Sequence, residues 1–441
     1  MTVISLWVPI YPIMPDYLAQ MRELAARFGE AHPEYRVEVE GFGYLELPGE
    51  IHRAALAGTA PTIAQYFYTS AQEAKDTRTA DGRPLFTSVE RAIGRREEIL
   101  GERVVLGDVV PGVRGYYRYH GAVAAQPLLT STTLLYANTT LLARAGVHEI
   151  PRTWAEVEAA CEAVGRLRGD GPSHSITWPN HGWMFQQSVA QQGGFLVDHE
   201  NGRAGRAQKV DLASPEALAY AEWWRKLHRD GHYWYLYNGT GVDWDGNFRT
   251  FAEGQAALTL TSSVEVDRMV QAGRDGGFTV RAARMPYNQD VGRAGNVIGG
   301  DALWLSGGLD EHTSDGALAF MQFLCRPEHA AARHKATNFV PITTPAVQRL
   351  AAEGWYEQNP DFLVALDQIA TTTGSPAARG ALVGELAHIQ EISARAMHDV
   401  LVSGVDVKTR FTEATAEAQA RLDHYNAYCR GEVPRGPIHV G

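Results

Sequence analysis

The sequence predicts an α/β protein built from two lobes, and three observations lead to this prediction. The chain has 441 residues, which is more than one hydrophobic core usually organises. Strand-like and helix-like patterns alternate from residue 3 to residue 69, as in an open, largely parallel sheet with helices on its faces. Strand patterns return at 256–263 and 297–308 after a long helical stretch. The chain is therefore expected to leave its first lobe and to return to it later.

The first elements follow in the order strand, helix, strand, helix, strand. Short runs rich in β-branched and aromatic residues predict the strands, and apolar residues recurring every three or four positions predict the helices. A proline near its start and a glycine near its end support the second helix. The expected strands are 3–9, 35–42 and 62–69, and the expected helices are 16–30 and 48–61. Sheets of this kind bind ligands at the carboxyl ends of their strands, where Tyr44 and the aromatic run 66–68 lie.

The middle and final thirds are mostly helical. Amphipathic helices are expected at 153–167 and 214–231, each opened by a good capping residue, and an aromatic loop follows at 232–246. The expected N-terminal lobe comprises 1–134 and 262–308, and the expected C-terminal lobe comprises 135–261 and 309–441. Two lobes joined by several crossings move as a hinge, and the cleft between them is the expected ligand site.

Composition excludes several classes of function. The chain is 45% hydrophobic and 21% charged, with a net charge of −11 and no stretch rich in lysine and arginine. Neither nucleic acid nor an anionic membrane is therefore an expected partner. No apolar run approaches the length that crosses a bilayer. No export-signal pattern precedes the first strand, so the protein is either cytosolic or exported by a signal that is absent from this sequence.

The cysteines and the acidic residues give weak signals. Cys161, Cys325 and Cys429 are widely spaced, which matches neither a metal site nor a disulfide framework, although one pair could bridge in an oxidising compartment. The GxSxG, HExxH, GxxxxGK[ST] and strand-following GxGxxG motifs are absent from the sequence. Three carboxylates near predicted strand ends could pair as the acid and base of a glycosidase, but they form no specific constellation. They are Glu265, Asp267 and Asp301.

The segment 243–254 spaces its first polar residues like a calcium loop. Its glycine, however, falls at the fourth position, and Gly254 stands where such a loop needs a glutamate. We expect instead that Asp245 caps a helix and that Gly254 ends it. No metal and no cofactor is expected.

The segment WPNHGWMF, residues 178–185, places two tryptophans within eight positions. Either ring alone could simply fill a core, but aromatic and small polar residues gather at many predicted loops. Aromatic faces stack on the C–H faces of sugars, hydroxyls bind ligand hydroxyls, and paired glycines let the backbone approach a ligand. Jointly, this set favours binding over catalysis. It comprises Tyr44, Tyr66, Tyr68, Ser131, Trp178, Trp183, the 232–244 cluster, Ser262, Ser263, Gly299 and Gly300.

These residues lie in a chain that resembles an extracellular solute-binding protein (family 1) of an ABC importer, most like the glycerol-3-phosphate-binding type. LLYANTTLLARAG is typical of solute-binding proteins generally, whereas VIGGDALWL, FVPIT and EGWYEQNP are typical of the glycerol-phosphate branch. The resemblance runs nearly end to end. It implies a periplasmic-binding-protein-like fold, in which two lobes, each a sheet flanked by helices, trap a ligand at a hinge. It also implies no catalytic activity, a membrane permease as partner, a periplasmic or extracellular, membrane-associated location, and a monomer.

Carried over by position, the resemblance names ligand contacts and departures from them. The contacts are Tyr44, Ser131, Trp183, Ser262 or Ser263, and Gly299 or Gly300, with Trp178 and Asn180 in a segment like the cleft segment of maltose-type relatives. The departures are Tyr68 for a glutamate that grips glycerol hydroxyls, Phe339 for a tyrosine, Asp301 for a small neutral residue, and Leu382 for the arginine that clamps phosphate. Arginine binds phosphate through bidentate, charge-assisted bonds. Arg379, three residues upstream, is the candidate substitute.

The departures favour a neutral ligand. The expected function is the capture of a mono- or oligosaccharide or a glycosyl-polyol for delivery to a permease. The alternative is glycerol 3-phosphate or a glycerophosphodiester such as glycerophosphocholine, bound through serines and backbone N–H groups. A glycoside-acting enzyme stands third.

Overall fold

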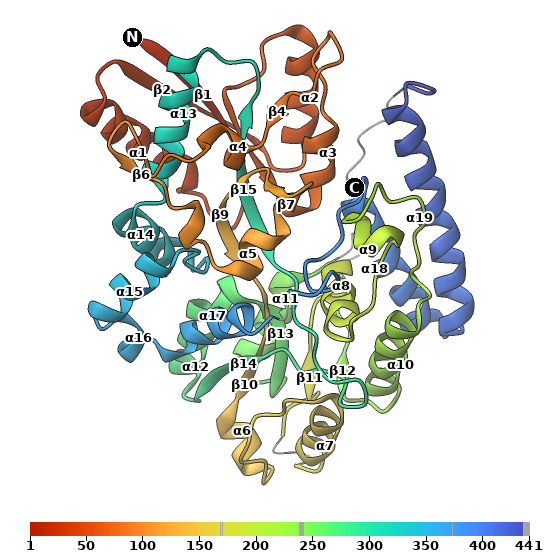
Figure 1. Ribbon diagram of the computed structural model, residues 1–441. Coiled ribbons are helices and arrows are strands. Elements are labelled where there is room, and N and C mark those ends of the chain that lie inside the picture. Colours follow the sequence, from red (N-terminus) through yellow and green to blue (C-terminus); the bar gives the residue numbers. More distant parts are fainter. Residues whose placement is uncertain (168, 170, 238–241, 373, 435–441) are drawn as a thin grey trace. The chain divides into compact units, whose positions relative to one another are not determined.

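The computed structural model describes residues 1–167, 169, 171–237, 242–372 and 374–434. The chain divides into two compact units. Unit 1 consists of Met1–Thr130, Ile298–Trp355 and the segment from Tyr425 onward, and unit 2 consists of Ser131–Val297 and Tyr356–His424. Figure 1 shows the elements of both units, coloured along the sequence. Residues 238–241 of the expected aromatic loop lie outside the described residues.

Unit 1 is built on a six-stranded mixed sheet in the order β2-β1-β3-β15-β4, and β9 pairs with β15 beside this path. Strands β1 (Thr2–Ile10), β2 (Tyr35–Gly43) and β3 (Ile63–Phe67) run parallel. Strand β15 (Gly299–Ser306) is antiparallel to β3 and to β4 (Phe86–Thr87). The predicted parallel arrangement is therefore confirmed for the three N-terminal strands.

Helices cover both faces of this sheet. Helix α1 (Tyr17–Ala31) and α13 (Glu311–Leu324) pack against β1 and against each other, while α2 (Leu47–Ala57) and α3 (Ala71–Asp76) lie on the opposite face (Figure 1). Right-handed crossovers explain this, because the β1–α1–β2 and β2–α2–β3 connections run in opposite directions across the sheet. The buried residues of α1 recur every three or four positions, which sets the face that it turns to the core.

The other elements of unit 1 are short connectors between the strands and two helices after β15. The connectors are η1 (Tyr68–Ser70), α4 (Val89–Ile93), β5 (Glu98–Ile99), β6 (Glu102–Arg103), η2 (Leu106–Asp108), α5 (Pro111–Tyr116), β7 (Arg118–Tyr119), β8 (Ala122–Val123) and β9 (Gln126–Ser131). The helices are α14 (Pro327–Thr337) and α15 (Thr344–Ala352), and α16 (Trp355–Gln358) begins where the chain passes into unit 2.

Unit 2 has a five-stranded sheet in the order β12-β11-β13-β10-β14. Strands β12 (Tyr233–Trp234), β11 (Ile176–Thr177) and β13 (Leu258–Ser262) run parallel, and β10 (Thr133–Asn138) is antiparallel to β13 and to β14 (Val280–Arg284). Helices α8 (Gly182–Gln191), α10 (Pro215–Arg229) and α18 (Leu386–Ser403) pack together on one side of this sheet. Helices α12 (Val266–Gly276) and α17 (Leu363–Ala370) cover the other side (Figure 1).

The remaining elements of unit 2 include the two predicted amphipathic helices with their caps. At α7 (Trp154–Gly165) the Thr153 hydroxyl accepts the backbone N–H of Glu156, and at α10 the Ser214 hydroxyl accepts that of Ala217. Helix α11 (Trp244–Ala252) is capped by Asp243, not by Asp245 as expected, because Asp243 Oδ1 accepts the N–H of Gly246. The other elements are α6 (Thr139–Arg144), α9 (Asp198–Gly202), η4 (Ser263–Glu265), η5 (Pro360–Phe362) and α19 (Val407–Cys429), whose C-terminal end belongs to unit 1.

The unit boundaries differ from the expected lobes. Residues 262–297 belong to unit 2, because β14 pairs with β10. Residues 309–355 and those from 425 onward belong to unit 1, where α13 packs on α1 and β1. These partners lie far apart in sequence, so local patterns could not assign them.

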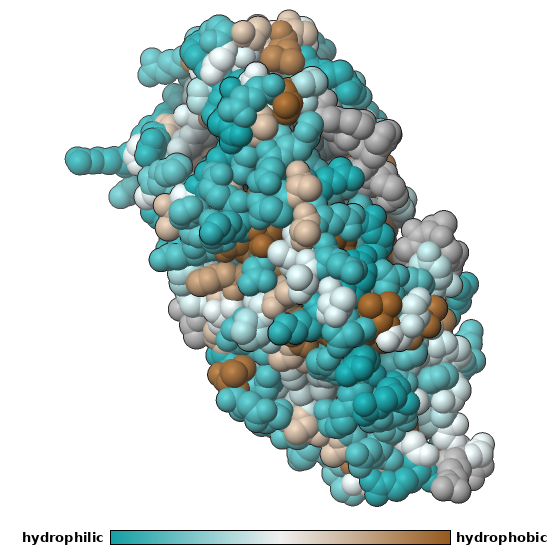
Figure 2. Space-filling model, turned by 90° about the vertical axis from the view of Figure 1, so that its right-hand side faces the viewer, coloured by the Kyte–Doolittle hydropathy of each residue, from teal (hydrophilic) through white to brown (hydrophobic). Residues whose placement is uncertain are grey.

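Figure 2 shows one face of the molecule, on which hydrophilic residues predominate and apolar residues form small separate groups. Among the described residues, no helix combines the length and hydropathy that a membrane crossing requires. Cys161 and Cys325 are buried, Cys429 is exposed, and all three are free thiols in this structure.

Candidate functional site

Three aromatic rings meet at the carboxyl edge of the unit 1 sheet. Tyr11 directly follows β1, Tyr44 directly follows β2, and Phe67 ends β3. The ring centroid of Tyr11 lies 5.4 Å from that of Tyr44 and 6.2 Å from that of Phe67, and Tyr44 is 37% exposed. These edge aromatics therefore occupy the end of the sheet where open α/β folds bind ligands. Sequence reasoning noted Tyr44 and Phe67 but missed Tyr11, although its position after the first strand was a usable signal.

A buried acid supports the edge aromatics. Asp301 on β15 lies opposite Phe67 in the strand register and is fully buried. Its Oδ2 accepts hydrogen bonds from the Tyr11 hydroxyl and from Gln65 Nε2, both at 2.7 Å. Burial raises the pKa of Asp301 to about 6, and the two hydrogen bonds oppose that rise. All these contacts of Asp301 are inside unit 1, so its clearest role is to hold Tyr11 in place.

The backbone conformation at the start of β15 explains one glycine of the pair there. Gly300 has φ +105°, and a Cβ there would overlap the backbone of Leu129 on the neighbouring strand β9. Only glycine allows this approach without strain. Gly299 is also buried at the same strand end.

The other predicted residues of unit 1 are buried, and two of them pack against aromatic rings. Tyr66 packs its ring edge-on against Phe86 and Trp304, at 5.7 and 6.2 Å between centroids. Tyr68, where the resemblance expects a glutamate, packs against Phe67 and Tyr116. Phe339 is buried, and its carbonyl oxygen lies 2.8 Å from His334 Nδ1.

In unit 2 the two tryptophans of WPNHGWMF have different surroundings. Trp178 is fully buried, with its ring nearly parallel to that of Trp223 at 5.5 Å and close to those of Trp224 and Tyr233. The Tyr233 hydroxyl also donates to the backbone oxygen of Trp178 at 2.7 Å. These are the contacts of a side chain that fills a core.

Trp183 lies in the first turn of α8, without such a neighbourhood. It is 6% exposed, and no aromatic partner for its ring and no hydrogen-bond partner for its Nε1 occurs among the described residues. The preceding His181 caps the helix, since its Nδ1 accepts the Trp183 backbone N–H at 3.0 Å. A Cβ at Gly182 would overlap the backbone of Gln390, which explains the glycine between them. Trp183 thus retains an unused donor.

An exposed ring lies beside this turn. The Trp244 ring, 38% exposed, lies 5.5 Å from the ring of His181. Burial lowers the pKa of His181 to about 4, so this imidazole is neutral at physiological pH. Asn180 is oriented by α18, because its Nδ2 donates to the carbonyl of Ala394 at 2.7 Å. Trp183, His181 and Trp244 form a second aromatic group, which we name the α8 aromatics.

The predicted serines of unit 2 lie close together. Ser131 ends β9, and the β10–β13 pairing places Thr133 opposite Ser262. Ser263 Oγ accepts the backbone N–H of Thr132 at 3.2 Å, and Ser262 Oγ accepts a backbone N–H two residues onward at 3.3 Å. Because both hydroxyl oxygens act as acceptors, their O–H groups remain able to donate.

A left-handed turn at 199–201 and the following Arg203 hold the loop 379–382 in place through hydrogen bonds. Residues 199–201 all have φ between 52° and 61°, a conformation that costs roughly 1–2 kcal/mol per non-glycine residue. The Asn201 carbonyl accepts the backbone N–H of Leu382 at 2.8 Å, and Arg203 donates to two carbonyls of the loop at 3.0 and 2.7 Å. Leu382 is 2% exposed as a result.

Arg379 projects from the same loop. Its guanidinium is half-buried, and its Nε has no hydrogen-bond partner among the described residues. Burial and, secondly, the neighbouring Arg203 lower the pKa of Arg379. The structure therefore puts an apolar side chain at 382 and a cation close by at 379.

The three carboxylates that the sequence singled out belong to two different units. Asp301 belongs to the core of unit 1, whereas Glu265 and Asp267 belong to unit 2, where Glu265 pairs with Arg268 at 3.4 Å. In the described part of the chain, no group of three or more histidine, cysteine or acidic side chains could hold a metal ion.

Comparison with known proteins identifies the family of the chain. Residues 23–364 match the family model described as bacterial extracellular solute-binding protein. The sn-glycerol-3-phosphate-binding periplasmic protein UgpB of Salmonella typhimurium is 26% identical over 394 residues, which cover 87% of this chain and 85% of that protein.

Solved structures share the fold. The cyclic alpha-maltosyl-1,6-maltose binding protein of Arthrobacter globiformis superposes with a TM-score of 0.74 at 18% identity, covering 96% of this chain and 99% of that chain. UgpB of Mycobacterium tuberculosis, solved with glycerophosphocholine, gives a TM-score of 0.70 at 21% identity, covering 97% and 100%. The fold is that of two-lobed periplasmic binding proteins. The chain belongs to the bacterial extracellular solute-binding proteins, and it is a periplasmic or extracellular receptor of an ABC importer, not an enzyme.

Proposed function

We propose that this receptor captures a neutral polyhydroxylated solute, a mono- or oligosaccharide or a glycosyl-polyol, and delivers it to its permease. The observation that carries the proposal is Leu382. At the position where the resemblance expects a phosphate-clamping arginine, the side chain is apolar and buried, and the turn at 199–201 holds its loop. A phosphomonoester needs charge-assisted donors, which a leucine cannot supply.

The proposed contacts come from two groups of aromatics, each within its own unit. The edge aromatics of unit 1 and the α8 aromatics of unit 2 offer ring faces suited to the C–H surfaces of a sugar. The O–H groups of Ser262 and Ser263 and the unused indole N–H of Trp183 offer donors for sugar oxygens. Ser131 completes the proposed set.

The alternative ligand is glycerol 3-phosphate or a glycerophosphodiester. Arg379 favours it, because a half-buried guanidinium with a free Nε is a natural partner for a phosphate oxygen. The Salmonella relative is named for glycerol 3-phosphate, and the Mycobacterium structure contains glycerophosphocholine.

Thermal-shift and calorimetric titrations with glucose, maltose, trehalose, glycerol 3-phosphate and glycerophosphocholine separate the two. A ligand that binds only the folded state raises the unfolding midpoint. We expect a neutral sugar to do so and glycerol 3-phosphate to have no effect. Tight binding of either phosphate compound, with none of the sugars, would refute the proposal in favour of the alternative.

A further inference from the structure

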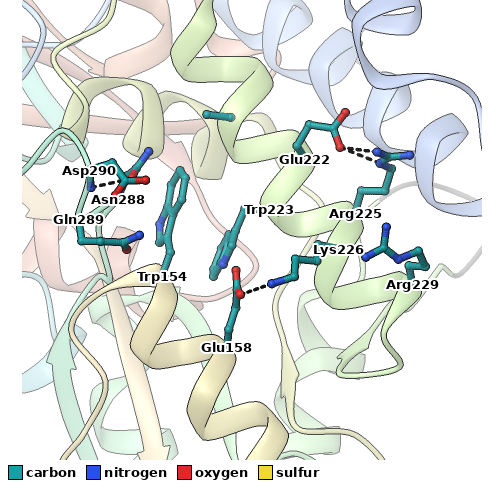
Figure 3. A pocket seen from close by; sticks show the side chains of 11 residues that line it. Trp154, Glu158, Glu222, Trp223, Arg225, Lys226, Arg229, Asn288, Gln289 and Asp290 are labelled. Carbon is teal, nitrogen blue, oxygen red and sulfur yellow. Dashed lines mark hydrogen bonds and ion pairs between the residues drawn. The ribbon is translucent and has the colours of Figure 1, made fainter.

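A pocket lies inside unit 2, apart from every residue discussed so far as a ligand contact. Its volume is about 420 Å³, within the usual range for small-molecule sites, roughly 300–1,000 Å³. Helices α7 and α10 and the loop 288–290 form its walls (Figure 3). Its lining residues are Trp154, Glu158, Ala219, Glu222, Trp223, Arg225, Lys226, Arg229, Asn288, Gln289 and Asp290.

Two stacked indoles form the floor of this pocket. The rings of Trp154 and Trp223 are 5.0 Å apart and within 14° of parallel, and Figure 3 shows them between the 288–290 loop and the charged side chains of α10. The two side chains are 5% and 7% exposed, and neither indole N–H has a hydrogen-bond partner among the described residues. Trp178 and Trp304 also bury an unpaired indole N–H, but neither lines this pocket. Two residues that line the pocket thus bury indole donors whose hydrogen bonds are unused.

The charges around the pocket balance. Three acidic and three basic side chains line it, and two ion pairs, Lys226–Glu158 between the helices and Arg225–Glu222 along α10, neutralise four of them. Such a rim attracts neither a net anion nor a net cation.

The loop 288–290 adds polar groups that can form further hydrogen bonds. Gln289 Oε1 accepts the N–H of Ala155 at 3.2 Å, which leaves the amide nitrogen able to donate. The exposed Asp290 carboxylate forms no ion pair among the described residues and can accept. The pocket thus combines donors on its floor with a donor and an acceptor on its wall.

We propose that this pocket is a second ligand site, which binds a neutral polyhydroxylated molecule of about one or two sugar rings. Each hydroxyl of such a ligand both donates and accepts. Its oxygens can accept hydrogen bonds from the indole N–H groups of Trp154 and Trp223, and its hydroxyls can donate hydrogen bonds to the Asp290 carboxylate. An anion gains no net attraction, because the three carboxylates of the rim balance its three cationic side chains. The proposal does not depend on the proposed transport ligand, because no residue is shared with the contacts proposed above.

Indole NMR tests the proposal directly. Protein labelled with [¹⁵N]tryptophan has one indole N–H for each of its 10 tryptophans. A Trp183→Ala background removes the Trp183 signal and weakens binding at the α8 aromatics, and glucose, maltose, glucuronate and inorganic phosphate are then titrated. We expect glucose or maltose to shift the signals assigned, by Trp154→Phe and Trp223→Phe, to the pocket. Glucuronate and phosphate leave them unchanged.

Matched variants test the hydrogen bonds. Trp154→Phe keeps an aromatic ring and removes the N–H, so binding in the pocket weakens roughly three- to tenfold. Trp304→Phe removes a buried, unpaired indole N–H from unit 1 and leaves binding within about twofold. Should Trp154→Phe fail to fold, the exposed Gln289→Ala replaces it and weakens binding to a similar degree. Shifts with glucuronate or phosphate but not with sugars, shifts with no compound, or unchanged affinity in the folded variant would each overturn the proposal.

Discussion

The edge aromatics of unit 1 and the α8 aromatics of unit 2 serve the same proposed purpose but are built differently. In unit 1 the rings stand at strand ends over Asp301, a fully buried carboxyl group. In unit 2 they stand at a helix start and beside a neutral histidine, with an indole N–H that has no partner among the described residues. In unit 1 the aromatic group is therefore hydrogen-bonded to a buried titratable residue, Asp301. In unit 2 the Trp183 indole N–H remains available to a ligand. The difference predicts that changes in unit 1 act mainly on folding and pH dependence, and changes in unit 2 mainly on binding.

The largest expected effect is a loss of unit 1 stability in Gly300→Ala. The substitution forces a side chain onto positive φ and into the backbone of β9, so the free energy of unfolding falls by about 3–5 kcal/mol. Urea titration followed by circular dichroism measures it. Gly58→Ala is the control, because Gly58 also has positive φ but nothing within 4 Å of its Cβ position. It costs about 1 kcal/mol, and equal losses in the two variants would contradict the close strand approach.

Next in size is the pH dependence that Asp301 gives to unit 1. Because its pKa rises from 3.8 in the reference state to about 6 in the fold, the folded protein holds this proton more tightly than the unfolded chain. The contribution to stability is full below about pH 4 and is lost as pH rises through 6. The stability lost between pH 4 and pH 7 amounts to about 3 kcal/mol.

Asp301→Asn removes this titration and keeps an oxygen that can accept from Tyr11. The wild-type free energy of unfolding, measured from pH 4 to pH 7, declines relative to that of the variant by up to about 3 kcal/mol. Parallel pH profiles would show that Asp301 is not held as the structure describes.

A smaller effect, confined to binding, is expected for Trp183→Ala. Loss of ring contact weakens ligand binding by roughly 1–3 kcal/mol and abolishes the ligand-induced fluorescence change. Calorimetry with the best ligand of the panel measures it, with Trp183→Phe as the variant that retains a ring. Unchanged affinity in Trp183→Ala would remove this residue from the proposed contacts and, with it, the contrast between the units.

The smallest expected effect distinguishes the two ligand classes. Arg379→Gln changes the affinity for a neutral sugar by less than about 1 kcal/mol, because no charge is paired on binding. If the alternative ligand is the true one, the same substitution costs about 1.5–3 kcal/mol in phosphate-ester binding. Competition titrations on one protein preparation decide between these results.

Local patterns were sufficient for the first elements of the fold and for two helix caps. The strands and helices of residues 3–69 and the caps at Thr153 and Ser214 depend on short-range periodicity and side-chain hydrogen bonds, which a sequence displays directly. The pairing of β14 with β10 and the packing of α13 on unit 1 depend on residues far apart along the chain. This is why the predicted lobe boundaries differ from the two units.

The candidate site was predictable in kind but not in detail. Nothing in the sequence of WPNHGWMF reveals that Trp178 meets Trp223 in a core while Trp183 does not. Asp301 was expected beside a ligand, but the strand register turns its side chain toward Tyr11 and Gln65. The left-handed turn at 199–201 contains no glycine, the residue type that would have predicted positive φ there. Each of these depends on tertiary packing.

Trp223 lies between Trp154 and Trp178, nearly parallel to both, at 5.0 and 5.5 Å. Indole chromophores held that close couple their electronic transitions, which produces a paired positive and negative band in the ultraviolet circular dichroism spectrum. This optical signature reports the packing of unit 2 alone, since all three rings belong to it. Heating or denaturant titration followed at that band therefore separates the melting of unit 2 from that of unit 1 in the intact chain.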